Sequence, residues 1–208
     1  MYEGKGNPRV RILHSSPDAP AVDIYVDDSP AITGLSFGQI SDFATLPSGR
    51  HNVKVYPASA SGKGQPVIEA NVDLMAGQDY TVVAIGKLQD IQPMVLVDTT
   101  TAPKGDMAKV RIIHASPDAP SVDIAVPGGP VLFRDVKFKQ TTSWMDVKSG
   151  SYTLEVRPAG STQAVMTVPN FRIEGGNLYT FVALGMLKGT PSFMILPVVD
   201  TVAMKMPA

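Results

Sequence analysis

The chain has 208 residues, a formal net charge of -1 and a charged fraction of 18%. This balance provides no basic field that would attract nucleic acid or an anionic membrane, and no apolar run is long enough to cross a bilayer. The lack of cysteine excludes thiol catalysis and disulfide bonds, and the 18 Gly and 18 Pro residues are typical of an all-β protein with many turns.

The same sequence pattern occurs twice along the chain. The segment VRILHSSPDAPAVDIYV at Val10–Val26 returns as VRIIHASPDAPSVDIAV at Val110–Val126. Shorter matches follow in the same order, such as YTVVAIGKL with YTFVALGML. The repeat predicts two domains, residues 1–98 and 109–208, joined by a short polar linker at 99–108 that contains Pro and Gly.

Side-chain periodicity in the first copy predicts strands rather than helices. His51–Tyr56 alternates apolar and polar residues, as a half-buried strand does, and Tyr80–Ile85 is a continuous apolar run typical of a central strand. Only Ser29–Leu35 is expected to contain a turn of helix. The predicted strands are Arg9–His14, Val22–Val26, Gln39–Leu46, His51–Tyr56, Val67–Asp73, Tyr80–Ile85 and Met94–Val97. The sequence therefore predicts an all-β protein made of two tandem β-sandwiches, with about seven strands each.

The repeated motif V-R-[IL]-[IL]-H-x-S-P-D-A-P-x-V-D-[IL], with the S-G turn and Y-T-[VF]-V-A-[IL]-G strand that follow it, resembles the bacterial "domain of unknown function 4397" family. The resemblance covers Pro8–Thr99 and Lys109–Thr201. It implies an immunoglobulin-like or prealbumin-like antiparallel sandwich, usually in tandem, in exported or surface-attached bacterial proteins. It supplies no activity and no catalytic residues. We therefore expect an extracellular or cell-surface protein whose signal peptide has been removed, because the segment MYEGKGNPRV has none of a signal peptide's features.

The residue types of a hydrolase triad recur in both copies around the SPDAP segment. A triad needs a serine, a base and a carboxylate that converge in space, whereas these residues crowd into one strand, turn and strand without a G-x-S-x-G elbow. A structural turn, with aspartates that accept backbone N–H groups, explains the pattern better. The residues are His14, Ser16, Asp18 and Asp23, with His114, Ser116, Asp118 and Asp123 as their equivalents.

An acidic cluster in the first copy raises the question of a calcium site, since oxygen-rich loops suit Ca²⁺. The cluster consists of Asp18, Asp23, Asp27 and Asp28. Pro127 and Gly128 replace Asp27 and Asp28 in the second copy, which leaves a sparse set of ligands. Three histidines without cysteine, two of them in different domains, do not suit zinc. We expect no metal and no cofactor.

Trp144 is the only tryptophan and could stack on a sugar, although core filling is the usual role of such a residue in a sandwich. Trp144, Asp27 and Asp28 differ between the copies and are the candidate ligand-binding residues specific to this protein.

We expect a non-catalytic, structural, adhesive or protein-interaction role at the cell surface. The partners would be other protein subunits or cell-envelope components, and a homo-oligomer could form through edge strands, with neither nucleic-acid binding nor membrane insertion. The alternative is a module that binds a small ligand or carbohydrate. A hydrolase with its site at the SPDAP turn is a third, weaker hypothesis.

Overall fold

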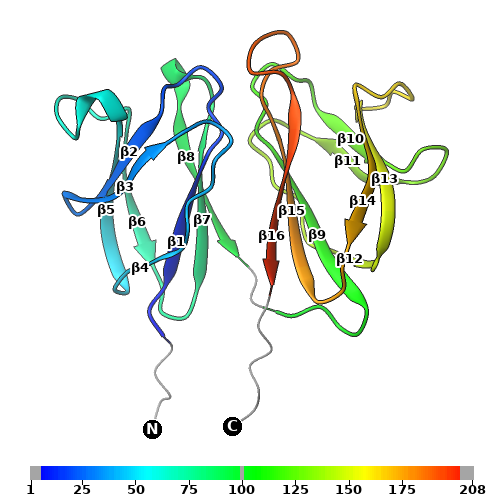
Figure 1. Cartoon of the computed structure of the whole chain (residues 1–208), viewed down its shortest axis with the longest axis horizontal. Helices are drawn as coiled ribbons and strands as arrows, with labels where there is room; N and C mark the ends of the chain where they lie inside the picture. The colour runs from blue at the N-terminus through cyan, green and yellow to red at the C-terminus, as the bar shows by residue number, and fades with distance from the viewer. Residues whose placement is uncertain (1–5, 99–100, 202–208) are drawn as a thin grey trace, which may run out of the picture. The chain divides into compact units, whose positions relative to one another are not determined.

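The computed structural model describes residues 6–98 and 101–201, and strands dominate both ranges (Figure 1). The chain divides into two compact units, Met1–Thr100 and Thr101–Ala208. Two short 3₁₀ turns at Ala58–Ala60 and Leu88–Asp90 are the helical segments of the described ranges, and neither is long enough to span a membrane. Of the expected linker, Thr99 and Thr100 lie outside the described residues.

The first unit is a sandwich of two four-stranded sheets, with orders β4-β1-β7-β8 and β3-β2-β5-β6. Its strands are β1 (Arg9–His14), β2 (Val22–Val26), β3 (Ser29–Leu35), β4 (Ala44–Thr45), β5 (Gly49–Pro57), β6 (Ile68–Leu74), β7 (Asp79–Ile85) and β8 (Gln92–Asp98).

The second unit repeats this arrangement, with sheet orders β12-β9-β15-β16 and β11-β10-β13-β14. Its strands are β9 (Met107–His114), β10 (Val122–Ala125), β11 (Val131–Val136), β12 (Met145–Lys148), β13 (Gly150–Pro158), β14 (Met166–Ile173), β15 (Asn177–Leu184) and β16 (Met194–Thr201). β9 thus begins inside the expected linker. The predicted all-β fold of two tandem sandwiches is confirmed, with eight strands in each rather than seven.

Two local predictions for the first copy were wrong. Ser29–Leu35 is strand β3, not a turn of helix. Asp27 and Asp28 have positive φ angles of 49° and 64°, which suit the tight hairpin that folds β3 back onto β2. Gln39–Leu46 is not one strand: it contains an isolated bridge from Ile40 to Leu13 and then the two-residue β4. Both segments lie at the edge of a sheet, where few side chains are buried. Their hydrophobic periodicity is therefore too weak to distinguish a strand from a turn or an irregular segment.

One strand pairing also differs from the antiparallel expectation. β1 and β7 are parallel, from Arg9 opposite Asp79 to His14 opposite Ala84, and β9 pairs with β15 in the same way. In an immunoglobulin sandwich the first two strands belong to one sheet, whereas here β1 and β2 lie in different sheets. Of the two expected fold types, the four-plus-four arrangement fits the prealbumin-like one.

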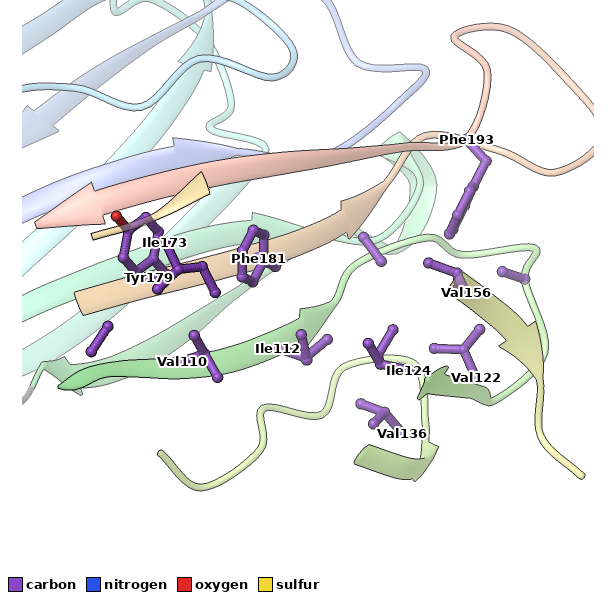
Figure 2. Close-up of a cluster of buried hydrophobic side chains, with 13 residues drawn as sticks. Val110, Ile112, Val122, Ile124, Val136, Val156, Ile173, Tyr179, Phe181 and Phe193 are labelled. Carbon is purple, nitrogen blue, oxygen red and sulfur yellow. The ribbon is translucent and has the colours of Figure 1, made fainter. Parts of the chain in front are cut away.

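The two cores use different side chains at equivalent positions. Val82 lies opposite Ile12 in the first core, where Phe181 lies opposite Ile112 in the second. The largest core cluster of the first sandwich is aliphatic. In the second, Phe181 lies within the cluster of buried side chains (Figure 2) and is 3% exposed. Its ring centroid lies 4.9 Å from that of Phe171. Each sandwich buries a hydrophobic core of its own.

Candidate functional site

The SPDAP corner begins at His14, the last residue of β1, whose side chain is fully buried. Its Nε2 atom lies 3.0 Å from the carbonyl oxygen of Pro20, and its Nδ1 atom lies 3.3 Å from the backbone nitrogen of Ser16. Because a carbonyl only accepts, Nε2 carries the proton, and Nδ1 accepts from the Ser16 N–H. The imidazole therefore ties the strand end to the turn that follows.

His114 makes the same two contacts in the second copy, at 2.9 Å to the Pro120 carbonyl and 3.4 Å to the Ser116 nitrogen. Burial lowers the pKa of both His14 and His114, and the hydrogen bond to the proline carbonyl offsets only part of this effect. Each ring is thus neutral, with both nitrogen atoms used by the backbone.

The serines of the corner do not approach the histidines through their hydroxyl groups. Ser15 Oγ donates to the Ala84 carbonyl at 2.8 Å, and Ser116 Oγ donates to the Gly185 carbonyl at 2.7 Å. Ser16 Oγ is buried and has no hydrogen-bond partner among the described residues. The hydrogen bond from nucleophile to base that a Ser-His-Asp triad requires is not formed.

The aspartate of SPDAP connects the corner to the loop that follows the seventh strand of each copy. Asp18 Oδ1 accepts the Leu88 N–H at 2.7 Å. Asp118 accepts two N–H groups, from Leu187 at 2.8 Å and Lys188 at 2.9 Å. Burial raises the pKa of Asp118, but the hydrogen bonds from these N–H groups lower it by more than burial raises it. The pKa therefore lies below its ordinary value. The carboxylates serve the fold as loop anchors.

Asp23 on β2 and Asp123 on β10 also accept hydrogen bonds from backbone N–H groups. Asp23 Oδ1 accepts the Gly34 N–H at 2.8 Å, whereas Asp123 accepts from Asp135 at 2.7 Å and Gly160 at 3.0 Å. Both strand pairs have a register shift beside this residue. Burial raises the pKa of Asp123, but the two N–H groups and nearby arginines outweigh it, and the pKa is lowered. Each carboxylate braces a bulge, where unpaired N–H groups need an acceptor.

The Asp27–Asp28 turn makes ion pairs with neighbouring strand β5. Asp27 Oδ2 lies 2.6 Å from His51 Nδ1, and Asp27 Oδ1 accepts the Asn52 N–H at 2.9 Å. Asp28 Oδ1 lies 2.7 Å from Lys54 Nζ. In the described part of the chain, no three His, Asp or Glu side chains lie close enough to share a metal ion.

His51 was missed by the sequence reasoning, although it is 7% exposed and both its nitrogens face acceptors. Its Nε2 atom donates to the Pro47 carbonyl at 2.8 Å. That carbonyl, followed by the Asp27 carboxylate, raises the pKa of His51. His51 in turn, followed by the Asn52 N–H, lowers the pKa of Asp27. The one available sequence signal was that His51 aligns with Tyr152, a residue of quite different chemistry.

Trp144 stacks on a buried arginine rather than standing free. The Arg111 guanidinium carbon lies 4.4 Å from the centre of the half-buried ring, and Arg111 Nε donates to Thr180 Oγ1 at 2.9 Å. In the first copy Phe43 covers Arg11 at the same 4.4 Å. The aromatic-on-arginine contact is therefore common to both copies. Sugar binding at Trp144 stays a prediction, and it would use the ring face that Arg111 leaves open.

A shallow groove of about 680 Å³ lies beside β3 in the first sandwich. Ile32, Leu35 and Ile40 contribute its apolar wall, and Ser41 and Asp42 its polar one. This volume is in the range of small-ligand sites.

Comparison with known proteins identifies the family. The model of the "Domain of unknown function (DUF4397)" matches residues 8–125 and 108–206. The chain belongs to the DUF4397 family. Because the two matches overlap at 108–125, the DUF4397 model reaches from one repeat into the SPDAP segment of the next. No curated protein matches this DUF4397 chain in a sequence search.

Two solved structures are similar to this DUF4397 protein. The Bacillus anthracis TIE protein is 16% identical, with a TM-score of 0.27, and the match covers 88% of this chain and 34% of that one. The chain thus spans about a third of the TIE protein's length. The structure described as "Alpha-glucan binding by a streptococcal virulence factor" is 8% identical, with a TM-score of 0.29 and coverage of 85% and 93%.

Proposed function

We propose that this DUF4397 protein is a non-catalytic tandem β-sandwich that acts at the outside of a bacterial cell by contacting other proteins or envelope components. The observation that supports this proposal is the use of the repeated polar residues. His14, Asp18 and Asp23, like their counterparts in the second copy, form hydrogen bonds with backbone groups of the chain itself. Function then falls to the surfaces of the sandwiches.

Those surfaces include apolar side chains on the outermost strands. Val97 of β8 is 54% exposed and Val199 of β16 is 49% exposed. Each of these strands pairs on one side only, with β7 and β15 respectively. Exposed apolar residues on an edge strand are a common means of binding an extended segment of a partner.

Export is the first part of the proposal to test. The full-length gene product, carrying a C-terminal tag, is expressed in its own host, and the cells are fractionated and treated with protease from outside. We expect the tag in the envelope or medium fraction and its loss on protease treatment of intact cells. Recovery in the cytosolic fraction, protected from protease, would contradict the proposed location.

The absence of catalysis is tested with purified protein and a panel of ester, peptide and glycoside substrates. We expect no turnover above that of the His14→Gln/His114→Gln double variant. Hydrolysis by the parent that this variant loses, while circular dichroism shows that it keeps its fold, would overturn the non-catalytic proposal in favour of an SPDAP-centred hydrolase.

The groove beside β3 supports a second candidate, the binding of a small ligand. Ile32 and Ala44 line this groove in the first copy, at positions that the larger Phe133 and Met145 occupy in the second. The Ile32→Phe/Ala44→Met variant fills the groove with the second copy's own side chains. If thermal-shift screening with sugars and small metabolites finds a ligand, this variant should lose binding and keep its melting temperature. Equal binding by both proteins would remove the groove as the site.

A further inference from the structure

The outer edge of β8 differs from the other long edge strands of the protein. β8 is the last strand of its sheet, and β7 is its ladder partner. Val95 and Val97, on one face of this strand, are 42% and 54% exposed. Both lie opposite core residues of β7, since Val95 pairs with Val82 and Val97 with Tyr80. Their side chains therefore extend the apolar face formed by Val82 and Tyr80 onto the last strand of the sheet.

The register reveals which backbone groups of β8 face away from β7. The Ala84 carbonyl accepts the Ser15 N–H at 3.0 Å, so Ala84 points toward β1. Its partner on β8 is Pro93, which therefore points away from β7. Because this direction alternates along an antiparallel ladder, the N–H and C=O groups of Val95 and Val97 also point outward.

The second copy carries a proline in the middle of the same edge. The Ala183 carbonyl accepts the Ala115 N–H at 2.7 Å, so its partner Ile195 points outward from β16, followed by Pro197 and Val199. Pro197 occupies the position of Val95 and removes the central donor. In β8 the proline, Pro93, lies near the start of the strand instead. The next two outward-facing residues, Val95 and Val97, therefore each keep both a backbone N–H and a C=O group for pairing.

The other long edges carry recognised protections against strand pairing. β3 has Pro30 and two register shifts. β11 has two register shifts and Asp135, whose φ is +46°. β14 has Pro169 beside Asn170, whose φ is +50°. β6 presents the exposed carboxylates of Glu69 and Asp73. In β8, the outward-facing Val95 and Val97 carry neither a proline ring nor a charge, and the pairing of β8 with β7 has no register shift.

We propose that two copies of the chain pair through β8, in antiparallel orientation, with Leu96 on the two-fold axis. This inference deepens the proposed function by naming a second copy as the partner. In this register Val95 of each copy lies opposite Val97 of the other, and each such pair exchanges two backbone hydrogen bonds. The result is one continuous sheet across the two molecules.

A second copy fits this edge because the edge is self-complementary. The four exposed valines meet in two cross-strand pairs on one face, which removes apolar surface from water. On the other face Asp98 lies opposite Met94 of the second copy, so no two carboxylates meet. A closed two-fold arrangement consumes both β8 edges, and pairing stops at the dimer.

The experiment is sedimentation velocity on the purified chain over about a 100-fold range of concentration, since so small an interface gives weak, concentration-dependent association. We expect the 22.1 kDa monomer to give way to a species of twice that mass. Val95→Pro copies the proline of β16 and should weaken association by about tenfold or more, because each copy loses an outward donor. Val97→Lys should do the same through its side chain, without altering the backbone.

The reverse substitution is the matched control. Pro197→Val opens a second edge on each molecule, so association is no longer closed and species larger than dimers should appear. Association that Val95→Pro and Val97→Lys leave unchanged, in folded protein, would overturn the inference, as would a wild type that stays monomeric throughout. A monomer that still binds envelope components would leave the proposed function intact, whereas a dimer without envelope binding would support β8 pairing alone.

Discussion

His51 and Tyr152 donate the same hydrogen bond in their respective repeats, each to the main-chain carbonyl four residues earlier. His51 Nε2 lies 2.8 Å from the Pro47 oxygen, and the Tyr152 hydroxyl lies 2.8 Å from the Lys148 oxygen. The two side chains hold the same turn in place before the fifth strand of each sandwich. Of the two, only His51 has a carboxylate partner, Asp27.

We expect the His51→Tyr variant to change how stability depends on pH. The Pro47 carbonyl and then Asp27 raise the pKa of His51 above its ordinary value of 6.5. A raised pKa stabilises the folded state fully below that value, and the effect is lost as the pH rises through the folded pKa. His51→Tyr keeps the carbonyl hydrogen bond but does not titrate in this range. The free energy of unfolding of the wild type should exceed that of His51→Tyr by the largest amount at about pH 5–6, and this difference should shrink toward about pH 8.

Urea unfolding of both proteins across this range measures the difference. Asp27 sets the acid limit of the window, because its lowered pKa stabilises the fold above the ordinary value of 3.8 and this stabilisation disappears as the pH falls through the folded pKa. A difference between the two proteins that does not vary with pH would contradict the ion pair.

His14→Ala should cost about 2–4 kcal/mol, since it leaves the Ser16 N–H without its acceptor and empties a buried site. It should also reduce the loss of stability in acid. Because burial lowers the pKa of His14 and His114, their contribution is present above about pH 6.5 and falls as the unfolded chain takes up protons below it. Thermal unfolding at pH 7.5 and pH 5.5 tests both effects. A variant as stable as the wild type at neutral pH would remove the structural role of the SPDAP histidine.

Asp118→Asn and Asp18→Asn form a matched pair. Asp118 accepts two N–H groups, one on each carboxylate oxygen, whereas an amide side chain offers a single acceptor. We expect a cost of about 1–3 kcal/mol for Asp118→Asn. Asp18 has one backbone donor, from Leu88, so Asp18→Asn should cost less, about 1 kcal/mol. Chemical denaturation measures both, and equal costs would show that the second N–H contact contributes nothing.

Phe181→Ala should destabilise the second sandwich by about 3–5 kcal/mol through the cavity it leaves beside Phe171. Val165→Ala is the control, because Val165 is 43% exposed and its truncation should change stability by about 0.5 kcal/mol or less. Hydrogen exchange should locate the loss in β13–β16. Protection that falls equally in both copies would contradict an effect confined to the second core.

The sequence predicted several elements at close to their observed bounds. β1 and β2 match the predicted ranges, whereas β5 extends its predicted strand by three residues and β7 by one. The predicted part of β5 alternates apolar and polar residues with a period of two, and β7 is buried from Tyr80 to Ile85, as its continuous apolar run predicted. β3 and the segment before β4 were misjudged because they lie at sheet edges, where few side chains are buried and the pattern fades.

The repeated sequence by itself determined two all-β domains, the family, and a structural interpretation of the SPDAP residues that their backbone contacts support. It could not determine which strands are neighbours, because a period of two tells which face is buried and not which strand lies alongside. Only the tertiary structure decided that β1 runs parallel to β7, that His51 meets Asp27, and that Val95 and Val97 direct their backbone groups outward. Each of these depends on contacts between residues far apart in the chain, and local patterns carry no record of them.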